Sequence, residues 1–129
     1  MPVATGLDRS PANLLADFRG VVVAAEIAFP DVLHVEVRDE AERIWKLATQ
    51  DAHWSPDDPE ALIGRSVVGA AIDEPGGRLR CGLSDGSELV VVPTAMDDKD
   101  DPPNWELITP YGVALEFGPG MRWQIARLT

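Results

Sequence analysis

His53 lies in the segment with the residue types best suited to chemistry. Asp51 precedes it, Trp54 follows it, and Asp57 and Asp58 come shortly after. A histidine beside a carboxylate can act as a general base, because the carboxylate orients the imidazole and stabilises its charged form. No recognisable nucleophile motif and no glycine loop that could bind an oxyanion accompanies the histidine. We therefore interpret it as a structural or binding site, and a hydrolase that uses His53 as its base is the weaker alternative.

The residues Gly82–Gly86 match the G-x-S-x-G pattern of a hydrolase nucleophile elbow around Ser84. That elbow joins a strand to a helix, and its catalytic histidine follows the serine in the chain. Here the next residues, Glu88–Val92, favour a second strand, and both histidines precede Ser84. Asp85-Gly86 is a two-residue hairpin signal, so we interpret the pattern as a β-turn and predict no catalytic residue.

Metal and cofactor sites are not predicted either. Four aspartates crowd into one proline-bounded segment: Asp97, Asp98, Asp100 and Asp101. Lys99 and Pro102 interrupt the alternate oxygen ligands that a calcium loop needs. Two histidines and a single cysteine, Cys81, do not make a multi-cysteine zinc site, and no glycine-rich nucleotide loop opens a helix. The aspartates are expected to form a solvent-exposed loop.

A net charge of -11 and a pI near 4.4 restrict the kind of partner. Nucleic acids and anionic membranes are bound by basic patches, so neither is expected. An acidic surface suits a basic protein, although solubility alone would also explain the charge. The residues predicted to bind a partner are Asp51, His53, Trp54, Asp97, Asp98, Asp100 and Asp101.

The remaining pattern is mostly that of β-strands. Ser10 as N-cap, Pro11 at the first position and Gly20 after the end predict one short helix over Pro11–Arg19. Strands are predicted at Val21–Ala28, Leu33–Val37, Ile44–Thr49, Ser66–Ile72, Leu79–Leu83, Leu89–Val92, Trp105–Thr109, Val113–Phe117 and Met121–Arg127. Residues 51–60 are interpreted as a loop with one helical turn capped by Asp58.

Two parts of the chain resemble each other. Leu33, Val35 and Val37 alternate with polar residues before Asp39, and residues 79–85 repeat that spacing with Asp85 at the end. We predict an all-β, mainly antiparallel fold, a small sandwich or partly open barrel built from repeated three-strand meanders. The length of 129 residues favours a single domain over 1–129, with 1–9 as a flexible N-terminal tail.

The chain is expected to be cytoplasmic and either a monomer or a homodimer. Its start has no basic segment followed by an apolar run, and no apolar stretch approaches the roughly 20 residues that span a bilayer. The lone Cys81 fits a reducing compartment.

Turn and core residues also resemble a known group of proteins. Asn104–Leu107, Pro110–Gly112 and Gly118–Gly120 with Trp123, together with residues 29–56, are similar to small bacterial, actinobacterial-type all-β proteins of unknown function. The resemblance implies a fold and no reaction. Some members look like immunity-type partners of bacterial toxins, which implies an inhibitor role.

We therefore expect a non-catalytic, soluble binding module whose acidic surface takes a basic protein. The alternative is a β-barrel that binds a small ligand, with its pocket near Trp54 and His53, since barrel mouths often hold ligands.

Overall fold

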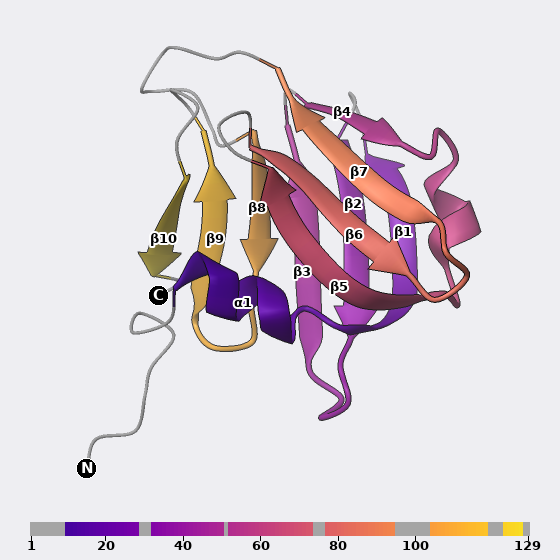
Figure 1. The fold of residues 1–129 in the computed structure, drawn as a ribbon, viewed down its shortest axis with the longest axis horizontal. Coiled ribbons are helices and arrows are strands. Elements are labelled where there is room, and N and C mark those ends of the chain that lie inside the picture. Colours follow the sequence, from indigo (N-terminus) through magenta and orange to yellow (C-terminus); the bar gives the residue numbers. More distant parts are fainter. Residues whose placement is uncertain are drawn as a thin grey trace.

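The computed structural model describes residues 10–28, 32–50, 52–73, 77–94, 104–118 and 123–127. Its elements are α1 (Pro11–Asp17), β1 (Gly20–Ala28), β2 (Val32–Arg38), β3 (Ile44–Thr49), β4 (Ala52–Ser55), the 3-10 turn η2 (Pro59–Leu62), β5 (Ser66–Asp73), β6 (Arg78–Leu83), β7 (Glu88–Pro93), β8 (Trp105–Ile108), β9 (Val113–Phe117) and β10 (Trp123–Arg127). The prediction of an all-β fold with one short N-terminal helix is confirmed (Figure 1). The predicted tail, residues 1–9, lies outside the described residues.

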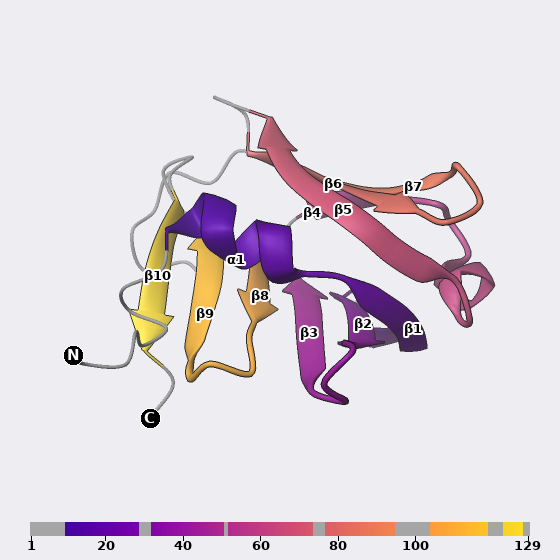
Figure 2. The same cartoon turned by 60° about the horizontal axis from the view of Figure 1, so that its bottom comes forward.

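The described strands form a single open antiparallel sheet in the order β10-β9-β8-β3-β2-β1-β5-β6-β7-β4. A short ladder joins β1 to β5, with Gly20 opposite Val67 and Val21 opposite Ser66. At this joint the sheet folds over, so that β5, β6, β7 and β4 form a layer above the other six strands (Figure 2). The fold is therefore a sandwich made by bending one sheet, and α1 lies at its open end.

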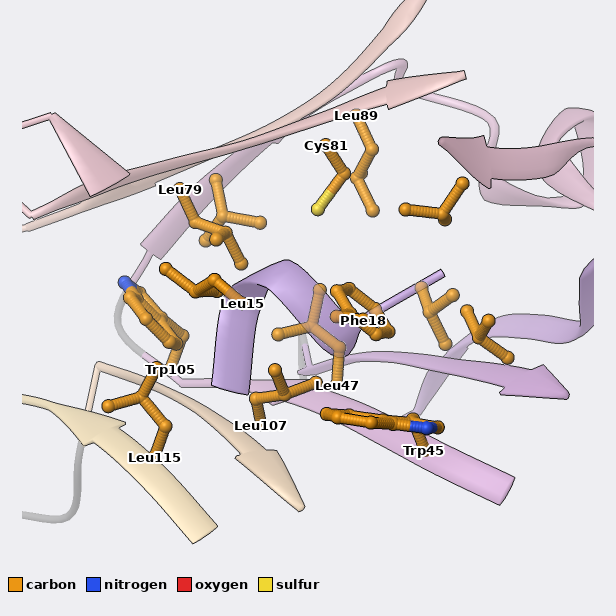
Figure 3. Close-up of a cluster of buried hydrophobic side chains, with 14 of the residues drawn as sticks. Leu15, Phe18, Trp45, Leu47, Leu79, Cys81, Leu89, Trp105, Leu107 and Leu115 are labelled. Carbon is orange, nitrogen blue, oxygen red and sulfur yellow. The ribbon is translucent and has the colours of Figure 1, made fainter. Parts of the chain in front are cut away.

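Alternating side chains from both layers fill the space between them. In β2 the inward residues Leu33, Val35 and Val37 are buried, while the residues between them are only half-buried. Trp45 and Trp105 are fully buried on the larger layer and face Leu79 and Cys81 of the smaller one (Figure 3). Burial, with a smaller contribution from the Glu88 charge, raises the pKa of the Cys81 thiol to about 12. That thiol is a core residue and stays protonated at neutral pH.

The helix α1 begins as predicted but ends earlier. Ser10 caps it, because the Ser10 Oγ accepts a hydrogen bond from the Asn13 N–H at 3.1 Å. Its last residue is Asp17 rather than Arg19, since Phe18 leaves the helix and packs its ring 5.6 Å from that of Trp45. The helix therefore ends before Phe18, because the Phe18 ring packs against Trp45 and helps to close the open end of the sandwich.

The predicted repeated meanders are present. β1, β2 and β3 form one antiparallel meander, and β5, β6 and β7 form another. The β1–β2 and β5–β6 ladders match in register, and the β2–β3 hairpin is two residues longer on each strand than the β6–β7 hairpin. Ile27 lies opposite Leu33 in the first, as Ile72 lies opposite Leu79 in the second, and a bulge interrupts each first ladder near its start. The Val21–Ser66 pair lies where the two meanders meet.

Both meanders use a three-residue turn between their second and third strands. Asp39 N–H donates to Arg43 O in one turn, and Leu83 N–H donates to Ser87 O in the other, each at 2.9 Å. The third loop residue is left-handed in both, Glu42 with φ 61° and Gly86 with φ 89°. The hairpin expected at Asp85-Gly86 is confirmed, but its loop has three residues and the predicted length of two is wrong.

The fourth strands of the two meanders are exchanged. β4 follows the first meander but pairs with β7 of the second, and β8 follows the second but pairs with β3 of the first. Trp54 in β4 lies opposite Val91, and Trp105 in β8 lies opposite Thr49. Val91 lies opposite Leu79, and the Leu33 N–H donates to Thr49 Oγ1. Leu33 and Leu79 match in the β1–β2 and β5–β6 ladders, so the two tryptophans take equivalent places in the ladders.

The interpretation of residues 51–60 as a loop is wrong for Ala52–Ser55, which form β4. This strand has only four residues and exists because β7 supplies its hydrogen-bond partners. The helical turn expected after Asp58 is confirmed as η2.

Candidate functional site

The strand β4 places His53 and Trp54 on opposite faces of the smaller layer. His53 is exposed and lies opposite Val92, whose side chain is 41% exposed. Trp54 points the other way, is half-buried and packs against the core. Within the described part of the chain the His53 side chain makes no hydrogen bond and no ion pair, and Asp51 lies outside that part. The described residues thus supply no orienting group for His53.

Three carboxylates follow β4 directly. Asp57, Asp58 and Glu60 are all exposed. The Asp58 Oδ1 caps η2 by accepting a hydrogen bond from the Glu60 N–H at 3.2 Å, while Pro59 and Leu62 are buried and hold the turn against the core. None of the three carboxylates forms an ion pair with a described residue. The segment after β4 therefore carries negative charge that no described cation compensates, on a fixed turn.

β4 is also an edge of the sheet, since β7 is its neighbour on one side and no described strand pairs with it on the other. Ala52 lies opposite Pro93, which has no N–H, so this is a non-hydrogen-bonded pair. Paired residues alternate along an antiparallel ladder, which makes Trp54 opposite Val91 a non-hydrogen-bonded pair as well. The backbone N–H and C=O of Trp54 consequently point to the open edge.

Charges elsewhere on the smaller layer are balanced. Asp73 Oδ2 lies 2.6 Å from Arg78 Nη2 and 3.0 Å from Arg80 Nε, and Arg80 also lies 3.8 Å from Glu88. The Arg78 hydrogen bond, assisted by the charges of Arg80 and Arg78, outweighs desolvation and lowers the pKa of Asp73. This network leaves little net charge on its strands, in contrast to the turn after β4.

A second acidic feature lies on the outer face of the larger layer. Glu106 and Glu116 face each other directly across β8 and β9. Burial raises the pKa of Glu106, and the Glu116 charge raises it further, against smaller opposing effects of Lys46 and His34. Gln124 Nε2 donates to Glu116 Oε1 at 2.8 Å. The sequence prediction missed this pair, because only the β8–β9 register brings the two residues together.

A cluster of five polar and aromatic residues, here called the Asp39 cluster, joins three separate elements: Asp17, Asp39, Arg43, Trp45 and Tyr111. Asp39 Oδ2 accepts hydrogen bonds from Trp45 Nε1 at 3.0 Å and Arg43 Nε at 3.1 Å. Arg43 lies over the Tyr111 ring, and the Tyr111 hydroxyl donates to Asp17 Oδ2 at 3.2 Å. The cluster connects α1 to the β2–β3 turn and the β8–β9 loop, so its role is structural.

Two open hollows flank the Asp39 cluster, with volumes of about 520 and 450 Å³. Arg19, Asp39 and Glu40 line both of them. His53 and Trp54 line neither, so these hollows do not support the small-ligand alternative at the predicted position.

The other predicted site residues, Asp97, Asp98, Asp100 and Asp101, lie outside the described residues. The described histidine, cysteine, aspartate and glutamate side chains form no group of three that could hold a metal ion. In the same residues no helix is both long and apolar enough to cross a membrane.

Comparisons of the chain with protein-family models, with curated proteins and with solved structures found no match.

Proposed function

We propose that this chain is a non-catalytic binding protein that holds a basic protein on an acidic surface. The observation that carries the proposal is the uncompensated charge after β4, where Asp57, Asp58 and Glu60 are exposed and form no ion pair with a described residue. The net charge of -11 supports the same kind of partner. Such a surface accelerates encounter with a basic protein and rejects acidic ones.

Inhibition of a basic toxin is one form that this function takes, and the resemblance to immunity-type proteins supports it. The resemblance rests on turn glycines and core tryptophans, so it supports the fold more than the partner. The aspartates of residues 97–101 add to the net negative charge that favours a basic partner.

The test is capture from a native lysate by the immobilised full chain, at low and at high salt, followed by identification and purification of what binds. The decisive variant neutralises the turn after β4: Asp57→Asn, Asp58→Asn and Glu60→Gln together. The matched control removes the same number of charges elsewhere: Glu26→Gln, Glu36→Gln and Glu40→Gln together.

We expect one basic protein that the wild type and the control retain, that the first variant loses, and that high salt releases. If the two triple variants lose the partner equally, net charge alone is responsible and this site is wrong. A partner that both variants retain at high salt would contradict an acidic binding surface altogether.

A further inference from the structure

Because β4 and β8 are equivalent strands, the neighbour of β8 indicates what kind of strand fits the open edge of β4. On the far side of β8 lies β9, with Phe117 opposite Trp105. The rings of these two residues stack with their centroids 6.0 Å apart, and Trp105 is fully buried. On the same side of β4 no described strand pairs, and the equivalent Trp54 is only half-buried.

The backbone groups of Trp54 in β4 also correspond to those of Trp105 in β8. In the β8–β9 turn the Thr109 N–H donates to Val113 O at 3.0 Å, and alternation along the ladder then makes Trp105 and Phe117 a hydrogen-bonded pair. Trp54 directs its own N–H and C=O to the corresponding side of β4. Its edge therefore has the same donor and acceptor that β8 presents to β9, beside an indole that is only half-buried.

We propose, resting on the proposed function, that β4 binds an extended basic segment of the partner protein as an added antiparallel strand. Main-chain hydrogen bonds to Trp54 hold the segment, and a large apolar residue opposite Trp54 takes the place that Phe117 takes opposite Trp105. Lysine or arginine residues of the bound segment extend beyond the end of β4 and lie against Asp57, Asp58 and Glu60.

Charge selects this occupant over a second copy of the chain. Two copies that met edge to edge would bring two sets of the same uncompensated carboxylates together, on chains that each carry a net charge of -11. Like charges at an interface oppose association, whereas a basic strand neutralises them. Natural proteins also use charge on an edge strand to prevent self-pairing.

The probe is a synthetic peptide with the β9 sequence, Val113–Phe117, that carries Glu116→Lys and added lysines at each end. The matched control is the same peptide with a methyl group on the backbone nitrogen of its phenylalanine, which keeps charge and side chains but blocks strand pairing. Binding is measured on the full chain by calorimetry, and amide hydrogen exchange reports where the peptide lies.

We expect the probe to bind at least about tenfold more tightly than the methylated control, because the control loses hydrogen bonds at the edge. Exchange of the Trp54 amide should slow on binding, while that of Ile125, which points to the open edge of β10, should not change. The variant with Asp57→Asn, Asp58→Asn and Glu60→Gln should bind the probe more weakly and with less dependence on salt.

Three outcomes would overturn strand addition. If both peptides bind equally and salt weakens both, the acidic surface acts without the edge, and the proposed function stands while this inference fails. If neither peptide binds although the captured partner still does, the edge is not the binding site. If the free chain dimerises with its Trp54 amide protected, the occupant is a second copy. Failure of the proposed function itself is seen separately, in the capture experiment.

Discussion

Asp39 illustrates how a single carboxylate organises this structure. Its side chain is only 8% exposed, and it accepts hydrogen bonds from the Trp45 indole, the Arg43 guanidinium and the backbone N–H groups of Ala41 and Arg43. These bonds link the β2–β3 turn to the core. The residue is therefore expected to matter for stability, and for pH dependence as well.

Burial raises the pKa of Asp39, but the Trp45 and backbone hydrogen bonds and the Arg43 charge outweigh it, so the pKa lies below that of an ordinary aspartate. A carboxylate with a lowered pKa stabilises the fold above the pKa of the unfolded chain, and the contribution is lost as pH falls through the folded pKa. Asp39→Asn should destabilise at neutral pH by about 1–3 kcal/mol, since it weakens a charge-assisted acceptor. The difference from wild type should shrink below about pH 4.

Thermal unfolding across this pH range measures the effect, with Glu40→Gln in the same turn as the control. An Asp39→Asn variant as stable as wild type at neutral pH would show that the Asp39 cluster contributes nothing.

Glu106 should behave in the opposite way. Its pKa is raised by burial first and then by Glu116, so ionisation costs stability that is present below the unfolded pKa and lost as pH rises through the folded pKa. Glu106→Gln should stabilise the protein at neutral pH by about 0.2–1 kcal/mol, the size of a like-charge cross-strand pair. Glu36→Gln is the control, because Glu36 lies opposite Lys46 and should bring no gain. Urea unfolding at neutral and at acidic pH measures the free energy of unfolding. A gain from Glu106→Gln that persists at low pH would contradict the electrostatic cause.

At the scale of elements, the two meanders differ at the same turn position. Gly86 takes the left-handed conformation with φ 89°, but its counterpart Glu42 has a side chain and takes it with φ 61°. Only glycine adopts this conformation without steric cost. The first meander therefore carries strain that the second avoids.

Glu42→Gly should raise the free energy of unfolding by about 0.5–1 kcal/mol, because the relief of strain exceeds the added flexibility of the unfolded chain. Glu40→Gly, in the same loop without a positive φ, should lower it. Denaturant titration of both variants tests the difference. Equal effects of the two substitutions would contradict strain at Glu42.

At the scale of the whole molecule, charge should separate stability from association. Much of the negative charge lies on exposed side chains that hold no element together, and charges of this kind interact weakly through solvent. They still act at a distance on an approaching partner, which makes association rate the sensitive quantity.

Neutralising Asp97, Asp98, Asp100 and Asp101 to asparagine should leave stability nearly unchanged, within about a few tenths of a kcal/mol for each. Association with a purified basic partner should become slower and less dependent on salt. Melting temperature and stopped-flow kinetics measure the two effects. Unfolding of the variant would show that this segment is structural.

Local pattern alone was enough for much of the fold. The strand predicted at Ile44–Thr49 matches β3 residue for residue, and Ser10 and Asp58 cap the elements that their sequence positions indicate. These features depend on alternation and on capping side chains, which act over a few residues. The repeat of residues 33–39 at 79–85 was likewise visible in the sequence.

Only the tertiary structure decided the position of β4 and the pairing of Glu106 with Glu116. The residues of β4 are too few to show a strand pattern, and they become one only by pairing with β7, far along the chain. The inward direction of Trp54 and the open edge beside it follow from that pairing. A strand's register is set by its partner, so contacts between distant segments cannot be read from either segment by itself.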